Sequence, residues 1–170
     1  MKRAIIALCL ILIGSSCVPA QELRGDSTSF DFWVGRWSLT WKDPDSSLAR
    51  GENTITKVLG GTVVQENFRG LSGANAGFDG MSLSVFNTAD TLWHQTWVDN
   101  QQSYMDFTGG TLGDKRFFAR QTVGPNGKAV FQRMVFFNIT REAFDWDWER
   151  SLDGKSWTLQ WRIHYERKKD

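Results

Sequence analysis

The amino-acid sequence predicts an all-β protein that folds as a single antiparallel up-and-down β-barrel of about ten strands. No stretch has a sustained period of 3.6 residues, whereas many short stretches alternate apolar and polar residues with the period of two that is typical of strands. Most segments between them are short and contain Gly, Asn, Asp or Pro, which favour hairpin turns. Short connections make neighbouring strands antiparallel, and many strands without helices form a sandwich or close into a barrel.

The first 20 residues have the pattern of an export signal, which we expect to be a cleaved signal peptide. Lys2 and Arg3 precede an apolar run over residues 4–13, and small residues lead to Ala20, the predicted cleavage position. The run is shorter than the ~20 residues of a membrane-spanning helix, so we expect no membrane span. The alternative is a lipid anchor at Cys17, because GSSC resembles a bacterial lipoprotein box, although Gly14 stands where leucine is usual. The protein is therefore expected to be exported, either periplasmic or secreted.

We expect residues 21–29 to form a flexible N-terminal segment and residues 30–168 to form one barrel domain, because 170 residues suit a single domain. Removal of Lys2 and Arg3 from the 20 basic residues leaves 18 against 19 acidic ones. This balance predicts no nucleic-acid partner. Both cysteines, Cys9 and Cys17, lie in or beside the leader, so cleavage after Ala20 leaves no disulfide, thiol nucleophile or cysteine-ligated metal in the domain.

The first half of the domain contains a short helical turn and four predicted strands. The turn lies at residues 27–32, where Ser27, Thr28 or Ser29 could cap it. The strands span residues 33–42, 51–59, 62–70 and 80–87, and Gly, Asp, Pro or Ser separates each from the next. The longest connection, residues 71–80, has three glycines. It is either a mobile lid or a hairpin loop without a role.

The second half contains six predicted strands, at residues 91–99, 103–109, 115–123, 129–138, 142–151 and 156–167. The last strand shows most clearly which face points inward. One face carries Trp157, Leu159, Trp161, Ile163 and Tyr165, while polar residues occupy the other. A contiguous aromatic patch of that size would cause association in water, so we expect this face to point inward.

The same alternation places the acids of the segment DWDWE, at residues 145–149, on the outer face, with Phe144, Trp146 and Trp148 inside. The acids have the spacing of a paired-carboxylate site, but an outer charged face is the favoured interpretation. Arg162 and Arg133 are candidate partners across neighbouring strands.

At least seven tryptophans therefore converge on one interior, each able to bury ~150–250 Å². A ten-stranded barrel of this kind is either partly hollow or filled by side chains. Few polar groups are expected inside: Gln95, Tyr165 and Tyr104, with Arg133 as an ambiguous case that would need Glu66 or Asp106 as its partner. The candidate ligand-binding residues are Trp37, Trp41, Trp93, Gln95, Trp97, Tyr104, Arg133, Trp146, Trp148, Trp161 and Tyr165.

Gly35-Arg36-Trp37 follows the predicted helical turn and resembles the G-x-W motif that opens the first strand of lipocalins. That resemblance implies a tryptophan that closes one end of the barrel beneath an arginine from a late strand, either Arg162 or Arg167. The segments FDFWVGRW, WHQTWVDN, RMVF and FDWDWERSLDG together resemble a lipocalin-like, calycin-type family of small exported bacterial proteins of unknown function. This resemblance covers nearly all of the mature chain and implies a fold without an activity.

A more distant resemblance is to nitrobindin, a ten-stranded barrel that holds haem through a histidine on a late strand. His164 occupies such a strand, but it alternates with Ile163 and Tyr165 and is expected to face solvent, as is His94. We therefore expect no haem or other cofactor and no metal site. The same outward positions disfavour a Ser–His–Asp triad, and no glycine-rich phosphate loop is present.

The sequence favours a binding module, a barrel that holds a small hydrophobic or aromatic molecule in a tryptophan-lined interior. One alternative is an enzyme of the isomerase or cyclase kind on the same scaffold, for which Asp106 or Glu66 with Arg133 is the only candidate set. The other is a solid-cored structural or interaction domain without a ligand. A binding role is favoured over catalysis.

Overall fold

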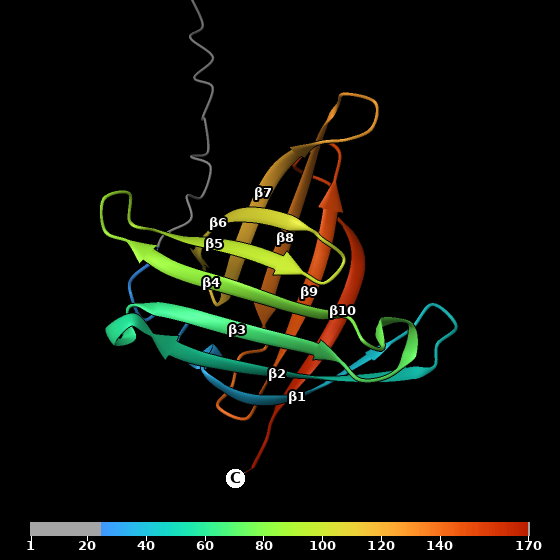
Figure 1. The fold of residues 1–170 in the computed structure, drawn as a ribbon. Helices are drawn as coiled ribbons and strands as arrows, with labels where there is room; N and C mark the ends of the chain where they lie inside the picture. The colour runs from blue at the N-terminus through green and yellow to red at the C-terminus, as the bar shows by residue number, and fades with distance from the viewer. Residues whose placement is uncertain (1–24, 170) are drawn as a thin grey trace, which may run out of the picture.

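A computed structural model describes residues 25–169, and the predicted signal peptide and Cys17 lie outside this range. The chain forms a closed barrel in the order β1-β10-β9-β8-β7-β6-β5-β4-β3-β2, with antiparallel pairing at every step (Figure 1). The predicted fold class is therefore confirmed. The strands are β1 (Gly35–Lys42), β2 (Leu48–Val58), β3 (Val63–Gly70), β4 (Asp79–Asn87), β5 (Leu92–Asp99), β6 (Tyr104–Leu112), β7 (Lys115–Val123), β8 (Ala129–Phe137), β9 (Ala143–Ser151) and β10 (Thr158–Arg167).

Three short 3-10 turns accompany the strands: η1 (Asp31–Trp33), η2 (Leu59–Gly61) and η3 (Gly73–Asn75). The turn expected before the first strand is η1, but no serine or threonine side chain caps it. Instead the preceding residues bond to the barrel. The indole nitrogen of Trp93 donates to the carbonyl oxygen of Asp26 at 2.9 Å, and Nε of Arg116 donates to the carbonyl oxygen of Ser29 at 2.9 Å.

The end of the barrel beside η1 is closed by an interlocked tryptophan and arginine. Trp37 is fully buried, and its indole nitrogen donates to the carbonyl oxygen of Trp33 at 2.8 Å. The Arg167 guanidinium lies 4.1 Å from the Trp37 ring centroid and donates to the carbonyl oxygen of Val34 at 3.0 Å. A Cβ at Gly35 would lie 2.1 Å from Nη1 of Arg167, and φ is +147° there, so both space and backbone require glycine. Of the two predicted arginines, Arg167 occupies this place.

Eight of the nine tryptophans belong to or pack against the hydrophobic core. The exception is Trp157, whose expected inward position is wrong. A register shift in β10 pairs Leu159 with the outward Glu149 but Trp161 with the inward Trp148, so the residues before the bulge change face. Trp157 consequently lies outside, with the Arg133 guanidinium 3.9 Å from its ring centroid.

The expected outer charged face of β9 is confirmed. Each acid bonds to a basic group on a neighbouring strand: Asp145 to His164 at 2.8 Å, Asp147 to Arg162 at 2.7 and 2.6 Å, and Glu149 to Arg133. His94 also lies outside, 2.7 Å from Asp90.

Strand β4 turns polar residues toward the interior and apolar residues toward solvent, which is the reverse of the usual arrangement. Ser82 and Ser84 are fully buried, whereas Met81, Leu83 and Val85 are 42%, 48% and 39% exposed. Pairing fixes this orientation, because Ser82 lies opposite Glu66 of β3 and Trp97 of β5, which both point inward. One wall of the interior therefore carries small polar side chains.

We predict that Arg167→Lys lowers the free energy of unfolding by about 1–3 kcal/mol, because lysine keeps the charge but loses the planar contact with Trp37 and the paired carbonyl bonds. Urea unfolding measures this change. Arg141→Lys is the matched control, because the Arg141 side chain is 92% exposed and should be neutral. Equal stability of the two variants would contradict the proposed role of Arg167.

Candidate functional site

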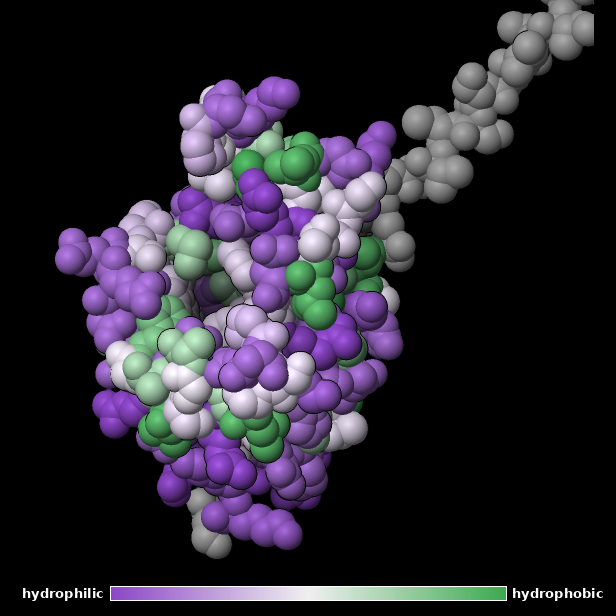
Figure 2. All heavy atoms as spheres, turned by 90° about the vertical axis from the view of Figure 1, so that its right-hand side faces the viewer, coloured by the Kyte–Doolittle hydropathy of each residue, from purple (hydrophilic) through white to green (hydrophobic). Residues whose placement is uncertain are grey.

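The interior holds a cavity of about 270 Å³, so the barrel is partly hollow. Figure 2 faces the end of the barrel opposite η1, where a recess lies between the surrounding side chains. Aromatic rings supply most of the lining: Trp33, Phe68, Phe78, Trp97, Trp146, Trp148 and Trp161. The other lining residues are Met105, Met134 and Ile163, with four polar ones, Glu66, Asp99, Gln132 and Tyr165.

The cavity exists because large side chains on one wall face small ones on the other. Strands β8–β10 contribute Met134, three tryptophans and Ile163, whereas the first part of the inner face of β4 carries the small residues Gly80, Ser82 and Ser84, with Phe86 following at the other end of the strand. At Gly80, a Cβ would lie 2.0 Å from the Trp97 ring. The Trp97 indole therefore lies against the backbone of β4 at Gly80, a position that any larger residue at 80 would block.

A band of hydrogen-bonded polar side chains crosses the inner wall of β2–β5. Its centre is Glu66, whose carboxylate accepts bonds from Nδ2 of Asn53 and from Oγ of Ser82, both at 2.7 Å. Nε2 of Gln95 donates to Oγ of Ser84 at 3.0 Å and continues the band. Nδ2 of Asn53 also lies 3.4 Å from the Tyr165 hydroxyl. The band holds the Glu66 carboxylate in a fixed orientation at the cavity.

Glu66 is a buried carboxyl group that has no basic partner among residues 25–169. It is 6% exposed, and burial raises its pKa from 4.5 to about 7 although the bonds from Ser82 and Asn53 act in the opposite direction. Burial also raises the pKa of the Tyr165 hydroxyl, and the nearby Glu66 charge adds to this effect. At neutral pH the cavity therefore holds a carboxyl group that is close to its titration point and a phenol that stays protonated.

Two indole N–H groups at the cavity have no hydrogen-bond acceptor. Nε1 of Trp33 and Nε1 of Trp161 are both buried, and neither has a partner among the described residues. A buried donor without an acceptor costs about 1–3 kcal/mol. These two atoms are therefore positions at which a bound molecule, or water, would gain from offering an oxygen.

Asp99 supplies a second carboxylate where β5 ends, on the side of the recess. Burial disfavours its charged form, but bonds from the Trp97 indole at 3.0 Å and from the backbone nitrogens of Ser103 and Gln101 outweigh burial and hold the pKa below its usual range. Asp99 is therefore ionised at neutral pH. None of the described residues that line the cavity has a basic side chain.

The structure gathers five of the predicted ligand-binding residues around the cavity: Trp97, Trp146, Trp148, Trp161 and Tyr165. Four others, Trp37, Trp41, Trp93 and Gln95, are buried in the core but do not line the cavity. Their inward position agrees with the expectation, and a binding role for any of these nine stays a prediction.

The inward position expected for Tyr104 is wrong, and Arg133, whose direction the sequence left ambiguous, faces outward. Tyr104 is 67% exposed because it pairs with the outward Val98, and this parity also turns Asp106 outward. Arg133 alternates with the inward Gln132 and Met134 and bonds to Glu149 on the outer face. The set of Glu66, Asp106 and Arg133 considered for an enzyme is therefore not assembled, since only Glu66 reaches the interior.

Several residues that line the cavity were not predicted from the sequence. Trp33 is separated from Trp37 and Trp41 by even numbers of residues. The period of two could therefore have placed it on the same inward face. Phe78 comes from the 71–80 connection, and it packs 6.3 Å from Trp97 between ring centroids. This loop is also tied to the barrel, because the backbone nitrogen of Ala74 donates to Asp43 at 2.8 Å. Asp99 and Phe78 show that both strand ends and loops complete the site.

No group of three or more His, Cys, Asp or Glu residues in the described chain is arranged to hold a metal ion. Among residues 25–169, no helix is long and apolar enough to cross a membrane.

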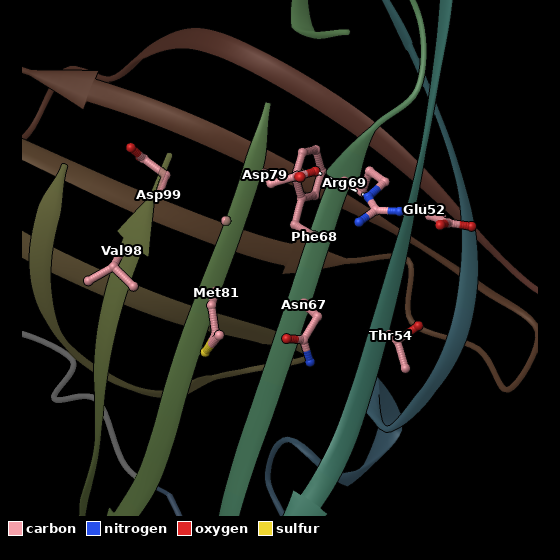
Figure 3. A pocket seen from close by; sticks show the side chains of 10 residues that line it. Glu52, Thr54, Asn67, Phe68, Arg69, Asp79, Met81, Val98 and Asp99 are labelled. Carbon is pink, nitrogen blue, oxygen red and sulfur yellow. Dashed lines mark hydrogen bonds and ion pairs between the residues drawn. The ribbon is translucent and has the colours of Figure 1, made fainter. Parts of the chain in front are cut away.

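A larger hollow of about 490 Å³ lies on the outside of β2–β5 (Figure 3). Thr54, Asn67, Met81 and Val98 project from successive strands there, and Arg69 lies 3.3 Å from Asp79 beside them. This surface is open to solvent, Arg69 pairs with Asp79, and Glu52 pairs with Lys168. The interior cavity is the stronger candidate despite its smaller volume, since it can enclose a ligand on most sides.

No family model matches the sequence, and no curated protein matches it. Solved structures do match. One is a redesigned β-barrel with a TM-score of 0.46 and 10% sequence identity, over 85% of this chain and 99% of that chain. We draw no functional conclusion from this likeness, so function is argued from the cavity.

We predict that Glu66 makes the protein less stable as the pH rises. The unfolded chain releases this proton near pH 4.5 and the folded protein near pH 7, so the folded state binds more protons between these values and stability falls across them. Glu66→Gln removes the effect. Its free energy of unfolding relative to the native sequence should rise by about 3 kcal/mol between pH 4 and pH 8.

Urea unfolding of both proteins across this range measures the difference. The contributions of the other carboxyl groups to the pH dependence are the same in both proteins and cancel in the difference. Asp106→Asn on the outer face serves as the control for the removal of a carboxyl group. A constant difference between the Glu66 variant and the native sequence would contradict the raised pKa.

Proposed function

We propose that this protein is an exported, lipocalin-like binding protein that holds a small hydrophobic or aromatic molecule in its tryptophan-lined cavity. The observation that carries the proposal is the cavity of about 270 Å³, whose lining has eight aromatic rings, that of Tyr165 included, and three further polar side chains. An apolar pocket with a few fixed polar groups is the usual make-up of a small-molecule site.

The lipocalin-like assignment is supported by the closed end of the barrel. The G-x-W motif at Gly35-Arg36-Trp37 opens β1, and Arg167 from the last strand covers the Trp37 ring at 4.1 Å. This is the arrangement that the sequence resemblance implies. Export is supported by the leader pattern of residues 1–20, with cleavage after Ala20 or a lipid anchor at Cys17 as the two routes.

The size and walls of the cavity favour a flat ligand. Its volume lies just below the range of about 300–1,000 Å³ that is typical of ligand pockets, which suits a molecule of about one or two rings. Trp146 and Trp148 lie nearly parallel, with an interplanar angle of 6°, and Trp161 stands edge-on to Trp146 at 89°. Such surfaces can stack on an aromatic ring or contact its edge.

The observations weigh against the two alternatives. A solid core requires a filled interior, whereas this barrel has a cavity. An enzyme on this scaffold would have only Glu66 and Asp99 as acids at the cavity, because Asp106 and Arg133 face outward.

We predict that a neutral aromatic probe such as 2-phenylethanol changes the intrinsic tryptophan fluorescence and that the effect saturates. Gln132→Trp adds bulk to the cavity lining and should weaken this binding by about tenfold or more. Gln121→Trp places the same side chain on the exposed face of β7 and should leave affinity unchanged. Equal affinity of the two variants, or no saturable change with a panel of neutral aromatic probes, would contradict a binding site in the cavity.

A further inference from the structure

We propose that the ligand carries a protonated amine on an aromatic or apolar body, with the ammonium group held by Glu66. This inference rests on the proposed function and specifies its ligand class. The physical basis is a cavity whose only charged lining groups, among the described residues, are two carboxylates.

The first argument is the unpaired charge of Glu66. Each of its two carboxylate oxygens accepts one bond, from Asn53 and from Ser82, whereas an ionised carboxylate can accept about four. Both donors are neutral. An ammonium group has three N–H donors and would add the missing opposite charge. A buried carboxylate is normally paired with a cation, and here the ligand would supply it.

The second argument is the aromatic surroundings of this carboxylate. The faces of tryptophan rings carry negative potential and attract cations within about 6 Å of the ring centroid. Trp97, Trp146, Trp148 and Trp161 all line the cavity that Glu66 lines. A cation bound to this carboxylate would therefore lie in a cavity lined by indole rings, which also offers Met105, Met134 and Ile163 to the apolar part of the ligand.

The third argument is the charge at the recess. Asp99 lines the same cavity and is held ionised by the Trp97 indole and by backbone N–H groups. An anion entering the cavity would approach two carboxylates without any basic lining residue to offset them. A cation is favoured along this path.

Two observations define what else the ligand carries. The indole nitrogens of Trp33 and Trp161 lack acceptors, so a neutral oxygen such as an ether, hydroxyl or carbonyl on the ligand would satisfy one of them. Nε of Arg120 is also buried without a partner, but Arg120 lies over Phe107 at 5.7 Å and does not line the cavity. An anionic ligand directed by Arg120 or by the indole donors is the competing outcome of the test.

The test compares three probes of one shape on the full-length mature protein by isothermal titration calorimetry at about pH 8. The probes are 2-phenylethylamine, 2-phenylethanol and phenylacetate, which are a cation, a neutral molecule and an anion at that pH. We expect the amine to bind at least about tenfold more tightly than the alcohol, and phenylacetate to bind most weakly.

Glu66→Gln should remove the preference for the amine and change the affinity for the alcohol by less than about threefold. Asp99→Asn should weaken amine binding by about twofold to threefold, and it provides a second variant should the first fold poorly. Asp106→Asn, on the outer face of β6, is the matched control and should bind all three probes as the native sequence does.

Equal affinity of the amine and the alcohol would overturn the amine inference and leave the aromatic binding site intact. Tightest binding of phenylacetate would overturn it in favour of an anionic ligand. Failure of all three probes to bind would contradict the proposed function itself, together with the inference that rests on it.

Discussion

The packing of eight indole rings inside one small barrel is the constraint on which the rest of the structure depends. Rings of this size fit only where the opposite wall is thin, and the inner face of β4 meets this need with Gly80, Ser82 and Ser84. Met81, Leu83 and Val85 of β4 consequently face outward. Large side chains on β8–β10 face small side chains on β4, and the space between them is the cavity. The packing that forms the core therefore also forms the candidate site.

The same wall carries the polar band. Ser82, Gln95 and Asn53 form a hydrogen-bonded set around Glu66. A buried carboxyl group without a cation is unfavourable for folding at neutral pH. A protein that keeps one in an aromatic cavity sacrifices stability there, and a cationic ligand would recover it. At the closed end, by contrast, the Trp37 indole and the Arg167 guanidinium both donate to backbone carbonyl oxygens.

The sequence was sufficient to predict the fold, because turn residues and alternation define all ten strands and the G-x-W motif marks the closed end. The sequence was insufficient to predict which way side chains point where the alternation of apolar and polar residues is interrupted. The bulge between Leu159 and Trp161 moved Trp157 outside, and no residue type announces such a bulge. Arg133 lies on a strand whose two faces are similarly apolar, so its pairing partners decided its direction. Tyr104 lies opposite the face of β6 that carries Met105 and Phe107, and this pattern could have placed it outside. Asp99 and Phe78 reach the cavity from a strand end and a loop, where period-two patterns no longer apply.

The central claim is that these tryptophans form a ligand site rather than a packed core. Incorporation of 5-fluorotryptophan gives each indole its own ¹⁹F resonance, assigned by single Trp→Phe variants. On addition of 2-phenylethylamine, the resonances of Trp97, Trp146, Trp148 and Trp161 should shift together and saturate, while that of Trp157 on the outside stays in place. A shift confined to Trp157, or no saturable shift of the cavity resonances, would contradict the account.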